Sequence, residues 1–452
     1  MKKASKILSL LAVAAFLTAC DTRQKAPQVL SLDLSDAVAL FNGNGATEGE
    51  ETDFNLYKTN ESGVTKRVHI KTKRSDDDKY FLEKPIHTDL LEVSDEYFFA
   101  RIGGYDSDYN YFVNKKTGQA YQVEGDYSFH RYGYWLDSTN PIRDFSKDSN
   151  GNLYGKVYDY KSKHEVLAKI AVTDKKVKVE IIGNAVKEEI DRPRFNDYAA
   201  DKDGNVAYFG DGNWQYVSVD KNIVTFKDKK AVWTGYDGEI YSYNKNGTIE
   251  KLSYDKDKSE VVSTAVIEYP ELKDADFINM KILYIDKTQQ IYAYTTGSNY
   301  ELVLYQIYGE NLDAKPIVYT TEDLSYPKAA DNYFIINYGY SYSGVECDED
   351  CIYVTTYDND EFVINKIDTS KNMEHSQIRF KVDYLEGTRF LNNKKMHLFW
   401  WGHDQIYDDK SDSLASMSVS ILDLNTGKMS EQDPFLTGNS DRSSVINLKS
   451  YK

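Results

Sequence analysis

Histidines are among the residues of this sequence best suited to catalysis or metal binding. They are His69, His87, His130, His164, His375, His397 and His403. No two of them have the H-E-x-x-H spacing that places two zinc ligands on one helix face, and the chain has neither a G-x-S-x-G nucleophile elbow nor a glycine-rich phosphate loop. Aspartate and glutamate are too numerous to point to one carboxylate pair. We therefore predict no catalytic residue, no metal site and no cofactor.

Aromatic residues gather beside some of these histidines. Trp400 and Trp401 stand between two histidines in KMHLFWWGHDQIYDD, residues 395–409, and a second cluster is FHRYGYWLD, residues 129–137. Rigid aromatic area next to polar groups suits a sugar ring or a protein anchor better than a phosphate. The alternative is that the aromatics pack in the core and the histidines are solvated. The candidate ligand-binding residues are His130, Arg131, Tyr134, Trp135, His397, Trp400, Trp401, His403 and Asp404.

The N-terminus has the pattern of an export signal. MKKASK is basic, ILSLLAVAAFLTA is a short apolar run, and LTAC ends that run at residues 17–20. A basic segment before an apolar run too short for an ordinary membrane span is typical of export. LTAC resembles the lipobox of bacterial lipoproteins, which implies diacylation of Cys20, cleavage before it and acylation of the new amino terminus. An ordinary secretory signal is the alternative.

The lipobox resemblance has consequences for location. More than one acyl chain anchors a protein stably to a bilayer. Asp21, which follows the cysteine, resembles the inner-membrane retention signal of enteric-type bacteria, but other phyla ignore that rule. We therefore predict a lipid anchor in the cell envelope and leave the inner and outer membranes as alternatives.

Export also bears on the two remaining cysteines. Cys347 and Cys351 lie in the segment GVECDEDCIYV. In an oxidising compartment such a pair favours a disulfide, and we predict one as a structural clip. A metal site is the weaker alternative, because C-x3-C has no second cysteine pair and no nearby histidine. A redox role is weaker still, since the three acidic residues between the cysteines would raise a thiol pKa.

The stretch DKDGNVAYFGDGNW, which begins at Asp201, has the alternating carboxylates of a calcium loop. An EF-hand loop starting there needs glycine at its sixth position and glutamate at its twelfth, whereas the sequence has Val206 and Gly212. Similar polar-plus-glycine segments recur at 115–122, 148–155, 244–251 and 424–431. Such pairs supply the positive φ that tight hairpins need. We therefore predict turns between strands.

Those turns punctuate a chain with almost no helical periodicity. Short runs of alternating or aromatic-rich residues recur in groups of three or four, which predicts strands. The groups restart at roughly 37–74, 86–126, 145–184, 199–228, 231–269, 280–320, 332–380 and 395–435. Sheets stacked in a ring bury both of their faces, so this repeat predicts an all-β chain with a single β-propeller of seven or eight four-stranded blades. Tandem β-sandwiches are the alternative fold.

Two of the turns carry a family resemblance. SILDLNTGKMS, residues 420–430, resembles the outer-strand turn of quinoprotein-type propeller repeats, where a strand ends in D-x-x-T-G-K. NYFVNKKTGQAYQV, residues 110–123, is a looser copy. That repeat family includes dehydrogenases that hold a quinone cofactor and a non-catalytic lipoprotein that assists outer-membrane protein assembly. The resemblance covers these two turns and implies a propeller.

Composition limits the partners. The 452 residues include 72 acidic residues and 55 Lys and Arg residues, which give a net charge of −17. They also include 38 tyrosines, a residue that favours strands and whose hydroxyl can remain wet at an edge or interface. A negative field disfavours nucleic acid and anionic lipid surfaces. We divide the chain into a signal peptide (1–19), a lipidated N-terminus with a polar spacer (20–36) and the propeller (37–452).

We predict an exported, lipid-anchored propeller that acts as a non-catalytic binding or scaffolding module. Its expected partners are the membrane, through the N-terminal lipid, and an envelope protein or glycan, with no nucleic acid. The alternative is a carbohydrate-active enzyme, a polysaccharide lyase or hydrolase, on the same scaffold. The two differ in whether histidines and carboxylates converge on one pocket.

Overall fold

The computed structural model describes residues 27–44, 54–62, 64–74, 87–104, 107–129, 145–174, 176–183, 198–210, 212–270, 281–296, 301–310, 312, 315–325, 345–358, 361–381, 384–392, 395–401, 416–430, 435–436 and 445–448. Regular structure in these residues is β-strand, apart from short 3-10 geometry such as η3 (Thr369–Lys371). Within the same residues, no helix has the length and apolar character that crossing a bilayer would require. The predicted all-β class is confirmed.

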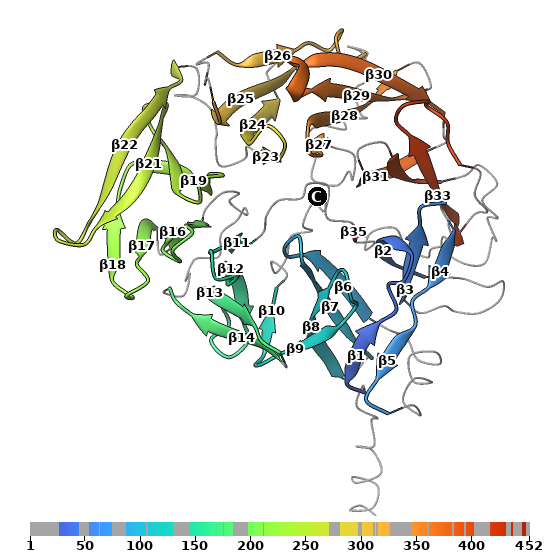
Figure 1. The fold of residues 1–452 in the computed structure, drawn as a ribbon, viewed down its shortest axis with the longest axis horizontal. Coiled ribbons are helices and arrows are strands. Elements are labelled where there is room, and N and C mark those ends of the chain that lie inside the picture. The colour runs from blue at the N-terminus through green and yellow to red at the C-terminus, as the bar shows by residue number, and fades with distance from the viewer. Residues whose placement is uncertain are drawn as a thin grey trace, which may run out of the picture.

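Four-stranded blades stand side by side in chain order around a central axis and form a ring (Figure 1). Blade 1 contains β35 (Val445–Asn447), β2 (Ala37–Asn44), β3 (Phe54–Asn60) and β4 (Thr65–Arg67), and blade 2 contains β6 (His87–Glu92), β7 (Tyr97–Gly104), β8 (Ser107–Asn114) and β9 (Ala120–Val123). In blade 3, β10 (Tyr127–Ser128) and β11 (Ser146–Lys147) both pair with β12 (Leu153–Asp159), which is followed by β13 (His164–Val172) and β14 (Lys176–Ile181). Blade 4 contains β15 (Tyr198–Ala200), β16 (Val206–Gly210), β17 (Asn213–Val217) and β18 (Ile223–Phe226).

The second half of the ring repeats the same order. Blade 5 contains β19 (Lys229–Thr234), β20 (Ile240–Asn244), β21 (Thr248–Asp255) and β22 (Glu260–Glu268), and blade 6 contains β23 (Lys281–Ile285), β24 (Gln290–Thr296), β25 (Leu302–Tyr308) and β26 (Ile317–Tyr319). Blade 7 contains β27 (Val345–Cys347), β28 (Cys351–Asp358), β29 (Glu361–Asp368) and β30 (Glu374–Phe380), and blade 8 contains β31 (Tyr384–Asn392), β32 (Lys395–Trp401), β33 (Ser416–Asp423) and β34 (Phe435–Leu436).

The described residues thus form a propeller of eight blades. Six are separate four-stranded sheets, and blades 2 and 3 share one nine-stranded sheet because β9 and β14 pair in parallel. The predicted propeller is confirmed, with the larger of the two predicted blade numbers, and the sandwich alternative is wrong. The last blade begins at residue 384 with β31, ahead of the predicted start at 395.

The ring is closed by pairing the end of the chain with its beginning. β35 supplies the inner strand of blade 1 and pairs antiparallel with β2, with Leu40 opposite Ile446. The first predicted module, 37–74, supplies only three strands to blade 1, because its fourth strand, β5 (Ile70–Thr72), belongs to a separate sheet. Leu40 and Ile446 are both buried, at 0% and 2% exposure, so the closure is part of the hydrophobic core.

The core lies between blades, because each sheet presents both faces to a neighbour. Along β7, Phe98 packs with residues of blade 1, and the adjacent Phe99 packs with residues of blade 3. Both are fully buried, and burial of a side chain of this size stabilises a fold by about 1.5–3 kcal/mol. Successive strand residues point to opposite faces. Strands such as β12 are therefore buried along nearly their whole length.

Glycines in the predicted turns have the backbone conformation that the sequence required. They are Gly118 (φ 70°), Gly151 (81°), Gly204 (90°), Gly247 (87°) and Gly427 (68°). A positive φ is strained for residues that carry a Cβ atom. The interpretation of these segments as turns is confirmed, and the segment that begins at Asp201 is the turn between β15 and β16.

The fold includes part of the predicted spacer. β1 (Val29–Leu32) pairs antiparallel with β5 (Ile70–Thr72) in a small sheet on the outer rim beside blade 1 (Figure 1). Both end residues of β1 are 2% exposed. The Leu32 N–H donates a hydrogen bond to the Gly118 carbonyl of blade 2. Residues 29–32 therefore belong to the packed structure and connect blades 1 and 2.

Candidate functional site

Most of the predicted functional residues lie outside the described part of the chain. These are Cys20, His130, Arg131, Tyr134, Trp135, His403 and Asp404. The other three, His397, Trp400 and Trp401, belong to β32, whose backbone lies between β31 and β33 in blade 8. That these residues meet in one binding face stays a prediction.

The first residue of the other aromatic cluster belongs to the core. Phe129 is 3% exposed, and its ring centroid lies 4.8 Å from that of Phe99 and 5.2 Å from that of Phe112. These contacts join blades 2 and 3. For Phe129, the alternative that the aromatic residues pack in the core is therefore correct.

The histidine side chains that the structure describes lie apart in the ring. His69 lies between β4 and β5, His164 is in blade 3, and His375 is in β30 of blade 7. The Nε2 atom of His375 lies 3.0 Å from Asn365 Oδ1, and burial lowers its pKa. An enzyme of the alternative class needs histidines that converge on a pocket, and these three do not.

Aspartates recur in the turn between the first two strands of a blade. Asp148, Asp201, Asp237 and Asp348 occupy this turn in blades 3, 4, 5 and 7, and each carboxylate accepts a tyrosine hydroxyl. The donor–acceptor distances are 2.9 Å from Tyr154 to Asp148, 3.4 Å from Tyr216 to Asp201, 2.9 Å from Tyr241 to Asp237 and 3.0 Å from Tyr353 to Asp348.

The same carboxylates also hold their own turns. Asp348 accepts the backbone N–H groups of Asp350 and Cys351, at 3.1 and 2.7 Å. Asp201 accepts those of Asp203 and Asn205, at 3.0 and 2.8 Å. Aspartate favours turns because its short side chain can reach the backbone two residues further on. The tyrosine then fastens the turn to a strand of the same blade.

In two of these pairs, burial shifts the pKa of both partners. The pKa of Asp201 and that of Asp348 are raised by burial, while the hydrogen bonds from their turns act in the opposite direction. Burial and the adjacent carboxylates raise the pKa of the tyrosine partners Tyr216 and Tyr353. Each of these pairs donates and accepts a hydrogen bond within one blade.

We call the turn between the first two strands of a blade its inner turn. Inner turns of neighbouring blades are hydrogen-bonded to one another around the ring. Backbone hydrogen bonds run from Ser149 N to Lys202 O (2.9 Å), from Lys202 N to Gly238 O (2.7 Å) and from Lys287 N to Glu349 O (2.8 Å). They connect blade 3 to blade 4, blade 4 to blade 5, and blade 6 to blade 7. Between blades 5 and 6, the Tyr236 hydroxyl donates to Asp286 Oδ1 at 2.8 Å.

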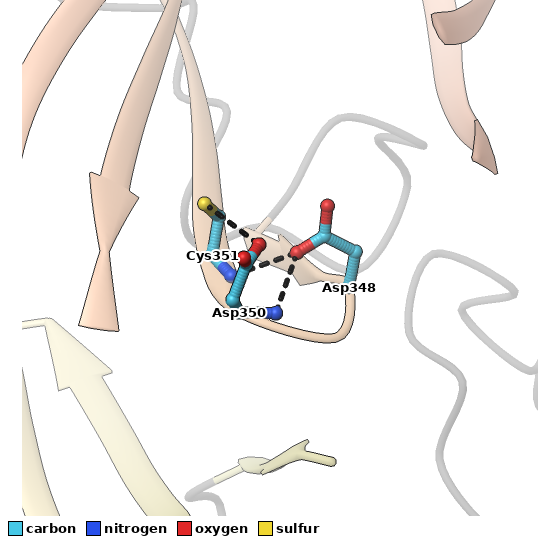
Figure 2. A group of neighbouring side chains, drawn as sticks. All are labelled: Asp348, Asp350 and Cys351. Carbon is cyan, nitrogen blue, oxygen red and sulfur yellow. Dashed lines mark hydrogen bonds between the residues drawn. The ribbon is translucent and has the colours of Figure 1, made fainter. Parts of the chain in front are cut away.

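One inner turn brings together three groups that could in principle bind a metal. Figure 2 shows Asp348, Asp350 and Cys351, whose potential ligand atoms lie within 4.8 Å of one another. Asp348 already accepts three hydrogen bonds, and Asp350 forms an ion pair with Lys287 at 2.6 Å. Burial and the two carboxylates raise the pKa of Cys351 to about 12, whereas a metal binds the thiolate. The group therefore fits a structural turn better than a metal centre.

The predicted disulfide between Cys347 and Cys351 is absent, and both residues are buried thiols. Cys347 is opposite Ile352 in the hairpin register, so Cys351, one residue earlier, lies on the other face of the sheet. Cys347 packs between blades 6 and 7, and Cys351 packs between blades 7 and 8. The short sequence separation suggested a disulfide, but the hairpin register directs the two side chains to opposite faces of the sheet.

Sequence reasoning did not find the aspartate–tyrosine pairs. In blades 3, 5 and 7 the tyrosine follows the turn aspartate closely, as in DSNGNLY, DGEIY and DEDCIY. This spacing could have suggested the contact. In blade 4 the tyrosine comes from the next strand of the hairpin, at position 216. The tyrosines of these pairs are buried, and their hydroxyls donate within the blade.

No family model and no curated protein matches this sequence. Among solved structures, a quinoprotein alcohol dehydrogenase-like protein from Bacteroides thetaiotaomicron is 11% identical, with a TM-score of 0.40 over 94% of this chain and 96% of the other. A putative 6-phosphogluconolactonase from Bacteroides uniformis is 10% identical, with a TM-score of 0.36 over 91% and 99%. The C-terminal WD40 domain of Sif2 is 10% identical, with a TM-score of 0.39 over 83% and 93%. Similarities this low carry no statement about what this chain does.

Proposed function

We propose that this protein is exported, anchored by lipid at Cys20, and acts in the cell envelope as a binding or scaffolding module without chemistry of its own. The observation that carries the proposal is the use of the inner-turn carboxylates, of which Asp148, Asp201 and Asp348 are buried and Asp237 is exposed. Asp148, Asp201, Asp237 and Asp348 each accept a tyrosine hydroxyl and bonds from their own turns. Acidic groups that would serve catalysis are engaged in holding a rigid ring.

Rigidity of this kind supports recognition. Loops on a stable scaffold can vary without disturbing the core, and binding residues concentrate there. Inner turns of successive blades are bonded together from blade 3 to blade 7. The predicted partner is an envelope protein or a glycan held by the aromatic clusters, and Trp401 at the end of β32 is the residue through which we test it.

Anchoring is tested by changing the lipidated residue. The Cys20→Ser variant should lose incorporation of labelled fatty acid and move from the membrane fraction to the soluble fraction. A variant that stays in the membrane fraction would contradict the anchor. Wild-type protein treated in parallel controls for release during cell lysis.

Binding is tested with Trp401→Ala. Purified variant and wild type are compared for capture of crosslinked envelope partners and for retention on immobilised envelope glycans, with circular dichroism as the check on folding. Tyr160→Ala, which removes an exposed aromatic from blade 3, is the control and should bind normally. Loss of stability without loss of binding would argue for a packing role. Turnover of a polysaccharide that depends on His397 or His403 would establish the enzyme alternative instead.

A further inference from the structure

One segment of this acidic chain is strongly basic. The stretch TKRVHIKTKR, residues 65–74, contains five basic residues and no acidic one, although the chain has a net charge of −17. The five are Lys66, Arg67, Lys71, Lys73 and Arg74. We call this segment the basic strip.

The basic strip presents its charges to solvent. All five basic side chains are exposed, whereas Val68, Ile70 and Thr72 are buried at 4–5% exposure. This alternation is that of strands packed on one face only. The strip runs through β4, the outer strand of blade 1, and through β5, which pairs with β1 on the rim of the ring (Figure 1).

One acidic residue near the strip is already paired with a lysine outside it. Asp33 lies near it, since its N–H donates to the His69 carbonyl, but its carboxylate pairs with Lys58 at 3.0 Å. Two exposed apolar side chains stand beside the strip: Leu30, which is 40% exposed, and Val64, which is 47% exposed. Basic groups mixed with exposed apolar ones are the chemistry of a membrane-surface contact.

The path of the chain brings this rim close to the predicted anchor. β1 begins at Val29, nine residues after Cys20. Nine extended residues span about 30 Å at most. A lipid on Cys20 would therefore keep the basic strip, which is paired to β1 through Lys71 and Thr72, within reach of the headgroups.

We propose that the basic strip is a second membrane contact, in which Lys66, Lys71, Lys73 and Arg74 dock on anionic headgroups of the bilayer that holds the lipid. This rests on the proposed lipid anchor. From the net charge we expected anionic surfaces to be disfavoured. The strip reverses that expectation only for the part of the rim beside blade 1. The ring then stands on its rim, and both of its faces are open to a partner.

Each lysine held near an anionic surface favours the bound state by a factor of about five. Opposing charge comes from Asp76, Asp77 and Asp78, which follow the strip in sequence and lie outside the described residues. The contact is thus weak by itself and orients a protein that the lipid already retains. Screening by salt should remove it, because exposed charges interact over about 10 Å or less at ordinary ionic strength.

The test uses full-length lipidated protein reconstituted in phosphatidylcholine vesicles with or without phosphatidylglycerol. Amine acylation followed by mass spectrometry reports the exposure of each lysine. We expect Lys66, Lys71 and Lys73 to be labelled about fivefold more slowly with phosphatidylglycerol, and high salt to restore the rate. Lys221 and Lys256, on blades 4 and 5, should be labelled equally in both vesicles.

Two triple variants separate local from overall charge. The K66E/K71E/K73E protein keeps Arg67 and Arg74 in the strip, and phosphatidylglycerol should no longer protect these two from an arginine-specific dicarbonyl reagent. The K221E/K256E/K258E protein has the same change of net charge on exposed lysines elsewhere, and its basic strip should remain protected. Loss of protection in both variants would mean that net charge decides, and would overturn the proposal.

Flotation of the same samples distinguishes failure of the anchor from failure of the strip. Protein that floats with phosphatidylcholine vesicles is anchored, and equal labelling of Lys71 and Lys73 in both vesicle types would then overturn the docking alone. Protein that does not float with phosphatidylcholine lacks the anchor, which would overturn the proposed function. Flotation that occurs only with phosphatidylglycerol, and is lost in K66E/K71E/K73E, would support the strip without the anchor.

Discussion

The inner turns of the ring and the basic strip on its rim use charge in opposite ways. At the inner turns, carboxylates such as Asp348 are buried and bonded to backbone N–H groups and a tyrosine hydroxyl. On the rim, Lys71 in the short strand β5 and Lys73, which follows that strand, are both exposed. Charge inside the ring is part of the fold, and charge on the rim remains available to a partner. The difference predicts which substitutions affect stability and which affect binding.

The largest contrast is in the reactivity of an inner-turn thiol. Burial and two carboxylates raise the pKa of Cys351 to about 12 from a usual value of 9.0. Because only the thiolate reacts, alkylation of the native protein at pH 8 should be slower by about a thousandfold than that of an ordinary thiol. Iodoacetamide should modify Cys347 and Cys351 only in the unfolded protein, and no reductant should be needed. Mass spectrometry measures the modification. Protein that needs a reductant before either thiol reacts would show that the disulfide exists after all.

The next effect concerns the stability of the inner turns. Asp348→Ala leaves two turn N–H groups and the Tyr353 hydroxyl buried without their acceptor, so the free energy of unfolding should fall by about 3 kcal/mol or more. Asp350→Ala, two residues away, removes a partly exposed ion pair with Lys287 and a weak hydrogen bond from the Cys351 thiol, and it should cost about 0.5 kcal/mol. Urea unfolding of both variants tests this. Equal losses would mean that the aspartate–tyrosine pair does not stabilise the turn.

A smaller effect concerns Asp33, whose N–H donates to the His69 carbonyl in the basic strip. Hydrogen bonds from Ser35 and the nearby Lys58 lower its pKa to about 2 from 3.8. A carboxyl with a lowered folded-state pKa stabilises the fold above pH 3.8, and this contribution is lost as the pH falls from 3.8 toward 2. Asp33→Asn should therefore flatten the decline of stability in that window by less than about 1 kcal/mol, since the side chain is half-exposed. Identical pH profiles would contradict it.

The smallest expected effect is on the rim. Lys71→Glu with Lys73→Glu should change the free energy of unfolding by less than about 0.5 kcal/mol, because exposed positions without buried partners contribute little to stability. Urea unfolding at neutral pH measures it, with Asp348→Ala as the positive control. A loss as large as that of the control would place the strip in the fold and weaken the case for a membrane contact.

Much of the architecture could be predicted from local patterns. Strand groups with a regular period predicted blades, and polar residues followed by glycine predicted turns whose glycines have positive φ. These signals are local, because a turn needs only a few adjacent residues and a strand only its own alternation. The candidate ligand-binding residues were chosen on composition alone. Of these, the structure assigns His397, Trp400 and Trp401 to a strand.

By itself, the sequence determined the all-β class, the repeat and the positions of the turns, since periodicity and turn chemistry act over a few residues. Only the tertiary structure decided that β35 completes blade 1, that β1 belongs to the packed fold, and that Tyr216 reaches Asp201. It also decided that Cys347 and Cys351 face different blades. Each of these depends on which strands become neighbours when the ring closes, and that choice is made by the burial of sheet faces between blades rather than by any short stretch of chain.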